Sequence, residues 1–222
     1  MTTVVDRTEE KVESVFDHVT ALFPDEEVHR LGKQTLIGLS WAIEDEFCAR
    51  AERPVLIGSF QETRFWEPSR ARWVELARVA EKALVMGSFG GVEPTPEEVD
   101  AGLVRVDFPA ESPIAREWLV VCDSFELPAA LLARELPGQT TVPDRDRLFE
   151  ALWTIEADVV RETARRCTQV AATMGVAEAA PLLYHLAEQP RPSVVSPEAA
   201  SRLFNRVVVH LDLASRPVPD GI

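Results

Sequence analysis

The sequence is poor in the residues that disulfide-rich and metal-binding proteins need. Its three cysteines, Cys48, Cys122 and Cys167, are far apart and odd in number, which argues against a disulfide framework and is typical of a reducing compartment. Each lies in an apolar setting, which predicts a buried structural thiol. The histidines show no metal-ligand spacing, so we predict no metal site; they are His18, His29, His185 and His210.

Basic residues and long apolar runs are also scarce. Lys and Arg total 23 against 37 Asp and Glu, which gives a net charge of −14. Such a charge repels phosphate backbones and anionic lipid head groups, so a direct nucleic-acid or membrane-surface role is disfavoured. No apolar run approaches the roughly 20 residues of a membrane-spanning helix, and residues 1–6 lack the order of an export signal. We therefore expect a cytoplasmic protein.

Catalytic motifs are incomplete. Ser40 lies in Gly-Leu-Ser-Trp-Ala, which lacks the last glycine of a nucleophile elbow and falls inside a helical pattern. Residues 87–91, Gly-Ser-Phe-Gly-Gly, follow an expected strand but lack the spacing of a phosphate-binding loop. Packing and turn roles are the better interpretation of both segments, and we expect no enzyme.

What the sequence does contain is a repeated strand ending. Residues 55–60 read Val-Leu-Ile-Gly-Ser-Phe, residues 84–89 read Leu-Val-Met-Gly-Ser-Phe, and residues 120–125 form a looser third copy. Continuous apolar runs of this length favour strands buried on both faces. A helix around Trp73 and Leu76 separates the first two copies, which predicts a βαβ unit with both Gly-Ser-Phe ends at one edge of the sheet.

The remaining elements predict more helix than strand. Residues 103–108 alternate like a half-exposed strand, which we expect to pair antiparallel with residues 117–122. Thr95-Pro96-Glu97-Glu98 has a capping-box pattern. Further helices are expected at residues 8–22, 33–50, 128–136, 177–187 and 197–213, and one long helix from 148 to 174, with a length of roughly 40 Å.

Together these patterns predict an α/β fold with a mixed, partly parallel sheet of about four to five strands flanked by helices, with N- and C-terminal helical extensions. We divide the chain into an N-terminal helical segment (1–34), an α/β sensory-like domain (35–175) and a C-terminal helical extension (176–222) packed on the same core. The long helix either covers a sheet face or pairs with its twin in a homodimer.

The edge where the strand endings meet is the strongest candidate for a ligand site, because open α/β sheets bind ligands beyond the carboxyl ends of their strands. The segment after the first copy offers aromatic rings, an amide and a guanidinium. In the competing interpretation the rings plug the sheet edge and Gln61 caps backbone groups. The candidate ligand-binding residues are Phe60, Gln61, Arg64, Phe65, Trp66, Phe89, Asp123 and Phe125. The cofactor is unknown.

A set of short motifs resembles the DICT sensory domain over roughly residues 35–172. The motifs are Ser40-x-x-Ile43-Glu44, Phe60-Gln61, Arg70-x-Arg72-Trp73-x-x-Leu76-Ala77, a strand ending near Gly87, and the later strand Trp118-Leu119-Val120-Val121. The resemblance implies a sensory module of a family that is joined to diguanylate cyclases, two-component proteins and, in actinobacteria, DNA-binding domains, and that is linked by context to light responses. It supplies no ligand, and a stand-alone copy needs a partner to transmit its signal.

These observations lead to three hypotheses. The first is a sensory or regulatory domain that binds a small molecule or a signalling protein and transmits a signal through its long helix. The second is a small-metabolite enzyme that uses Gln61, Glu62, Arg64 and Asp123. The third is a non-catalytic interaction scaffold that uses the C-terminal helix at residues 197–213.

Overall fold

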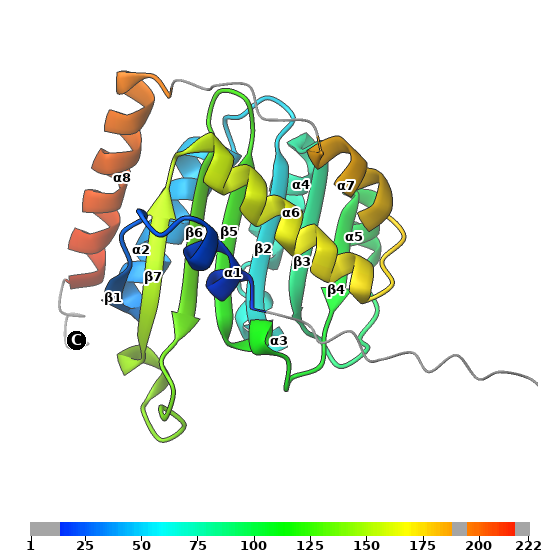
Figure 1. The fold of residues 1–222 in the computed structure, drawn as a ribbon, viewed down its shortest axis with the longest axis horizontal. Coiled ribbons are helices and arrows are strands. Elements are labelled where there is room, and N and C mark those ends of the chain that lie inside the picture. The colour runs from blue at the N-terminus through cyan, green and yellow to red at the C-terminus, as the bar shows by residue number, and fades with distance from the viewer. Residues whose placement is uncertain (1–13, 188–194, 216–222) are drawn as a thin grey trace, which may run out of the picture.

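The computed structural model describes residues 14–187 and 195–215, which form one mixed sheet between two layers of helices (Figure 1). The described sheet has seven strands in the order β1-β7-β6-β5-β2-β3-β4. The strands are β1 (His29–Gly32), β2 (Val55–Glu62), β3 (Lys82–Ser88), β4 (Leu103–Asp107), β5 (Glu117–Asp123), β6 (Ala129–Glu135) and β7 (Leu148–Thr154). The predicted mixed α/β fold is confirmed, with more strands than the four to five expected.

Helices cover both faces of this sheet. The helices on the near face in Figure 1 are α1 (Val15–Leu22), α6 (Ala157–Thr173) and α7 (Ala179–Leu186). The opposite face packs against α2 (Lys33–Ile43), its π-helical continuation η1 (Glu44–Cys48), α4 (Arg70–Val79) and α8 (Pro197–Ser215). The short helices are α3 (Thr63–Trp66), α5 (Pro96–Asp100), η2 (Pro113–Arg116) and η3 (Asp144–Asp146).

The βαβ unit predicted from the repeated strand endings is confirmed. Strands β2 and β3 pair in parallel, with Leu56 opposite Ala83, and α4 connects them on one face. Val55 and Ile57 belong to the core under α1 and α6, whereas Leu56 belongs to the core under α2 and α4. Because both faces of β2 are buried, its apolar run shows no alternation with polar residues.

The helix predicted at residues 128–136 is wrong, because this segment is strand β6. It pairs antiparallel with β5 and β7, and Ala129, Ala130 and Ala133 are fully buried. Alanine favours helices when isolated, but in this sheet its small side chain lets helices approach both faces of a central strand closely. Tertiary packing therefore overrides the local helical preference.

The long helix predicted from residue 148 to 174 is also wrong. Its first part is strand β7, held between β1 and β6, and its second part is α6, which has 17 residues. The chain turns where the Glu156 amide donates to Thr154 Oγ1 over 3.1 Å. Leu148, Leu152 and Ile155 imitate helical spacing, and because each face of β7 mixes buried and exposed residues, the strand shows no clear alternation.

The antiparallel pair predicted between residues 103–108 and 117–122 is absent from the described sheet. Strand β4 pairs in parallel with β3 at the edge, while β5 crosses to the middle and lies between β2 and β6. The Thr95–Glu98 capping box at α5 and the C-terminal helix α8 are both confirmed. Of the helix predicted at 8–22, residues 15–22 are helical and residues 8–13 lie outside the described part.

The three predicted buried thiols are confirmed: Cys48, Cys122 and Cys167 are all free and buried. Strand β1, which precedes residue 35, extends the sheet beyond β7, and α8 packs against α2 and η1. The proposed division of the chain at residues 34 and 175 stays a prediction.

Glycine at position 58 lets the α4 tryptophan lie directly over strand β2. A Cβ atom at Gly58 would lie 2.6 Å from the Trp73 ring, inside van der Waals contact. We therefore expect Gly58→Ala to lower the free energy of unfolding by about 1–3 kcal/mol, measured by urea denaturation. Gly32→Ala is the matched control, because a Cβ there meets nothing within 4 Å. Equal effects of the two variants would contradict this packing argument.

Candidate functional site

The structure separates the sequence-predicted site residues between two ends of the sheet. Phe60 lies near the end of β2 and Phe89 directly follows the parallel strand β3, so both lie at one end of the sheet, as predicted. Asp123 pairs with Val55, the first residue of β2, so Asp123 and Phe125 lie at the opposite end. Their predicted convergence with Phe60 is wrong because β5 runs antiparallel to β2.

Asp123 has a structural partner at its own end of the sheet. Its carboxylate forms an ion pair with Arg161 of α6, with 2.6 Å between Oδ2 and Nε. Burial raises the pKa of Asp123, and the Arg161 charge opposes this rise. Phe125 is more than half exposed in the turn after β5. Asp123 therefore ties α6 to the sheet, far from Gln61 and Arg64.

Three of the predicted rings pack into the core. The Phe60 ring meets Trp66 and Trp73 edge-on, at centroid distances of 5.1 and 5.5 Å. Trp66 is fully buried and donates its indole N–H to Glu98 Oε1 over 3.2 Å. Phe89 is also buried, with the Arg105 guanidinium 5.0 Å from its ring centroid. These three rings therefore pack at the sheet edge as part of the core, as the competing interpretation of the sequence predicted.

Gln61 differs from those residues because its backbone is strained and its side-chain amide has no described partner. Its φ angle is +56°, in the left-handed region, where the β2–β3 register is irregular between Ser59 and Glu62. The residue is only 5% exposed, yet no described residue accepts from its amide Nε2. A left-handed glutamine costs about 1–2 kcal/mol, and a buried unpaired amide adds to that cost. Such strain is typical of functional positions.

Beyond Gln61, helix α3 brings Phe65 against a buried lysine. The Lys33 Nζ atom lies 3.9 Å from the centroid of the Phe65 ring and 2.5 Å from Asp144 Oδ2. Lys33 is the first residue of α2, and only 8% of its side chain is exposed. A lysine buried to this degree needs a partner for its charge, which Asp144 of η3 provides.

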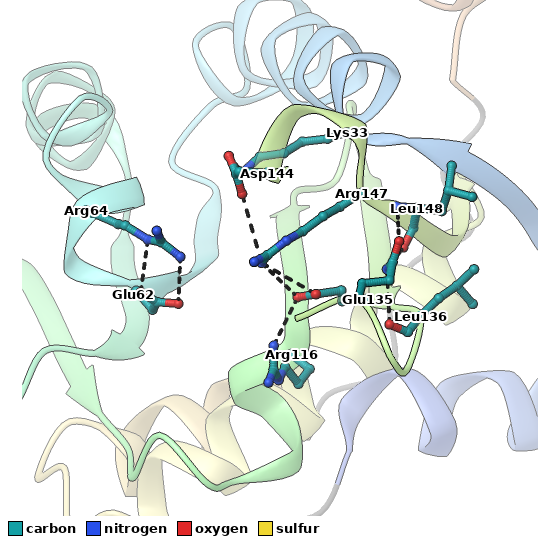
Figure 2. Close-up of polar contacts among 10 residues, drawn as sticks. Lys33, Glu62, Arg64, Arg116, Glu135, Leu136, Asp144, Arg147 and Leu148 are labelled. Atoms are coloured by element: carbon teal, nitrogen blue, oxygen red, sulfur yellow. Dashed lines mark hydrogen bonds and ion pairs between the residues drawn. The ribbon is translucent and has the colours of Figure 1, made fainter. Parts of the chain in front are cut away.

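Two arginines share one buried glutamate beside this lysine. Glu135, the last residue of β6, lies 3.4 Å from Arg147 Nη1 and 3.4 Å from Arg116 Nη1. Arg147 also reaches Asp144 at 4.0 Å, so the groups form a continuous row (Figure 2). Charge-assisted hydrogen bonds usually span about 2.7–2.9 Å, so these guanidinium groups keep donor capacity for a further anion.

Figure 2 shows the Glu62–Arg64 ion pair on the other side of the space from this row. We call the whole group the polar end. It consists of Gln61, Glu62, Arg64 and Phe65 on one side and Lys33, Arg116, Glu135, Asp144 and Arg147 on the other. Its charged side chains are four cations and three anions, an excess of positive charge in a protein of net charge −14.

A cavity of about 610 Å³ adjoins the polar end. Arg116 and Glu135 belong to both, and the rest of the lining consists of Ser14, Asp17, Pro113, Arg134 and the loop at residues 136–140. This volume lies within the range of about 300–1,000 Å³ that small-molecule sites occupy. Of the cations in the row, Arg116 lines the cavity, so a molecule in it has access to the free donor capacity of that guanidinium group.

The wall of this cavity includes the start of helix α1. Ser14 caps α1, and its hydroxyl donates to Glu117 Oε1 over 2.5 Å. The amides of Val15 and Phe16 donate to Glu117 Oε2 over 3.2 and 3.3 Å. Burial raises the pKa of Glu117 to about 7, although these hydrogen bonds favour the ionised form. Glu117 therefore holds α1 against β5 beside the cavity.

Sequence reasoning missed the second half of the polar end. Glu135 fell in a predicted helix, and Arg147 next to another, so neither was placed beside Gln61. A signal was present in residues 144–147, Asp-Arg-Asp-Arg, a dense charge pattern that follows Pro143. Gln139 closes the β6–β7 connection by bonding both the amide and the carbonyl of Leu148, which brings this turn beside Glu135.

Within residues 14–187 and 195–215, no group of three or more His, Cys, Asp or Glu side chains is arranged to hold a metal ion. In the same ranges, no helix combines the length and apolarity needed to cross a membrane.

Comparison with known proteins assigns this α/β chain to a sensory family. A family model described as the sensory domain in diguanylate cyclases and two-component systems, DICT, matches residues 13–136. This span is more than half of the chain, so the protein belongs to the DICT family. The family indicated by the sequence is thereby confirmed, although the match covers residues 13–136 and not the expected span of roughly 35–172. A search of curated proteins found no match.

The matched span runs from the start of α1 to the end of β6, so it includes most of the polar end. Lys33, Gln61, Arg116 and Glu135 lie inside it. Asp144 and Arg147 lie beyond it, as do α6 and α8. The C-terminal part of this chain therefore adds charged groups to a site that the family region begins.

The raised pKa of Glu117 predicts how stability depends on pH. Glu117 is ordinarily ionised above pH 4.5 when unfolded, but in the fold it holds its proton to about pH 7. The folded state thus binds more protons in this window, so the free energy of unfolding falls as pH rises through it. Glu117→Gln removes this titration. We therefore expect the free energy of unfolding of the variant, relative to that of wild type, to rise by up to about 3 kcal/mol from pH 4.5 to pH 8, measured by urea denaturation.

The control for this measurement is Glu111→Gln, which removes an exposed carboxylate. Its stability difference from wild type is expected to stay constant over the same pH range. If the two glutamine variants followed the same pH dependence, Glu117 would not be the titrating group.

Proposed function

We propose that this protein is a cytoplasmic sensory domain that binds a small molecule with an acidic group at its polar end. The family is sensory, which supports the general role. The observation that carries the specific proposal is Gln61, whose buried amide lacks a protein partner within residues 14–187 and 195–215 and whose backbone is strained. A ligand acceptor atom would satisfy that amide and offset the strain.

The charges of the polar end support an acidic ligand. Lys33, Arg116 and Arg147 all bind carboxylates of the protein itself, and two of these pairs are long. An incoming carboxylate or phosphate would add a second acceptor to each guanidinium group, which has five N–H donors. Phe65 supplies an apolar surface beside Lys33. We therefore favour a compact organic acid over a neutral molecule.

The signal would leave the polar end through α1 and the long helix, which in the structure is α6. Ser14 lines the cavity and caps α1, and His18 of α1 contacts Glu162 of α6 over 2.9 Å between Nε2 and Oε1. A ligand that displaces Ser14 would shift α1 and, through it, α6. The receiver would be a signalling protein or a second copy of this chain, since α6 faces outward from the sheet (Figure 1).

The enzyme hypothesis loses the residue set on which it was based. Its four groups are divided between opposite ends of the sheet, because Asp123 pairs with Arg161 while Gln61, Glu62 and Arg64 lie at the polar end. The scaffold hypothesis, which uses α8, stays a prediction.

Gln61→Gly separates binding from stability. Glycine adopts a positive φ without strain and removes the unpaired amide, so we expect stability to rise by about 1 kcal/mol and Tm by about 2–4 °C. The same change should abolish retention of a small molecule. The measurement is native mass spectrometry of protein incubated with a filtered cell extract and then desalted, together with thermal unfolding.

Arg53→Gly is the matched control. Arg53 has a φ of +46° in an exposed turn, and its ion pair with Glu81 is long at 3.6 Å. We expect this variant to gain similar stability and to retain the same small molecule as wild type. The proposal fails if wild type retains no molecule, or if Gln61→Gly retains it as well as Arg53→Gly does.

A further inference from the structure

We infer a second ligand site, beneath helix α8, that takes an apolar organic cation. It lies between α8 and strands β6 and β7, at the end of β7 away from Arg147. The site is therefore separate from the polar end, and its test is independent of the function proposed above. We call it the α8 pocket.

The α8 pocket has apolar walls and a suitable size. Its volume is about 520 Å³, within the usual range for small-molecule sites. The walls come from α2, β6, the β7–α6 turn and α8; they are Leu39, Ile43, Ala129, Ile155, Leu203 and Val207. Most of these side chains are buried or half-buried, so the hollow extends into the layer between α8 and the sheet.

The anchoring of α8 explains why the pocket stays open. Arg206 of α8 contacts Asp45 and Glu46 of η1, both at 3.3 Å, and His210 contacts Asp45 at 3.5 Å. A Cβ atom at Gly38 would lie 3.3 Å from the His210 Cβ, so α2 and α8 are already in close contact there. Because α8 is fixed along this side, it cannot move over β7 to fill the hollow without breaking these contacts.

Two exposed aromatic rings stand at the mouth of the pocket. Trp153 is 43% exposed and Phe204 is 68% exposed, and both line the cavity. Large aromatic side chains that are exposed beside a pocket mark a binding surface, because covering them lowers the free energy. Faces of tryptophan and phenylalanine rings also attract cations. The mouth therefore suits an aromatic or alkyl group that carries a positive charge.

The charged groups at the rim favour the same sign. Glu26 and Glu156 both line the pocket, and neither carboxylate has an ion-pair partner in the described part of the chain. The backbone of Glu156 is fixed by its hydrogen bond to Thr154 Oγ1, which orients the residue at the start of α6. Two unpaired carboxylates in a chain of net charge −14 repel organic anions and attract cations.

Three compounds that share a naphthalene ring and carry small head groups of different charge test the assignment. 1-Naphthylmethylamine is a cation, 1-naphthalenemethanol is neutral and 1-naphthoate is an anion, and isothermal titration calorimetry measures the affinity of each. We expect the amine to bind about five-fold or more tighter than the naphthoate, because two exposed ion pairs each contribute modestly. The Glu26→Gln/Glu156→Gln double variant should reduce this preference to less than about two-fold.

A pair of leucine variants tests the location. Ala200 lines the pocket, so Ala200→Leu fills it and should weaken binding of the amine about ten-fold or more. Ser201 is its exposed neighbour outside the lining, and Ser201→Leu should leave the affinity unchanged. Circular dichroism of both variants confirms that α8 remains folded.

The inference is overturned if the amine does not bind, if naphthoate binds as tightly, or if Ala200→Leu and Ser201→Leu bind alike. It is also overturned if light scattering shows a dimer and the amine affinity falls as protein concentration rises, because a second copy would then cover the pocket. Retention of an acidic small molecule at the polar end is unaffected by any of these outcomes, so the two proposals fail separately.

Discussion

Strand β5 runs antiparallel to β2 in the middle of the sheet, and the rest of the molecule depends on this reversal. It brings the first residue of β5, Glu117, and the preceding Arg116 to the end of the sheet where β2 finishes at Glu62. The antiparallel pairs that follow return the chain to the same end after β6 and before β7. Side chains from five separate segments therefore meet there. One of these segments contains Gln61, and the other four are distant from it in sequence.

This arrangement buries some of the charged groups of the polar end, which costs free energy that the apolar core must offset. Glu135 and Lys33 are almost fully buried, and each is paired with an opposite charge. Gln61 adds backbone strain and an amide without a described partner. Replacing buried ion pairs with apolar residues of similar volume is often neutral or stabilising, so stability alone does not account for these groups.

Local sequence patterns were sufficient for part of this fold. Strands β2 and β3, helix α4 between them and the Thr95 cap of α5 were predicted correctly, because each depends on neighbours in sequence. Strands β6 and β7 were taken for helices, since Ala129–Glu135 is buried on both faces and shows no alternation. That error also displaced Glu135 and Arg147, and so hid half of the polar end.

The site residues show the same division between local and long-range information. Gln61, Arg64 and Phe65 were predicted because they follow a recognisable strand ending, and the structure brings Phe65 into contact with Lys33. Lys33 lies 32 residues upstream of Phe65 in sequence, and no local pattern connects them. Asp123 was included because its strand ending resembled the others, and only the pairing direction of β5 shows that it belongs elsewhere.

The most direct test of an acidic-ligand site at the polar end is the NMR signal of the Gln61 side-chain amide. In ¹⁵N-labelled protein titrated with the small-molecule fraction of a cell extract, the account predicts that this resonance shifts together with the Arg116 and Arg147 guanidinium Nε–H signals. Shifts confined to residues away from the polar end, with the Gln61 amide unmoved, would contradict it.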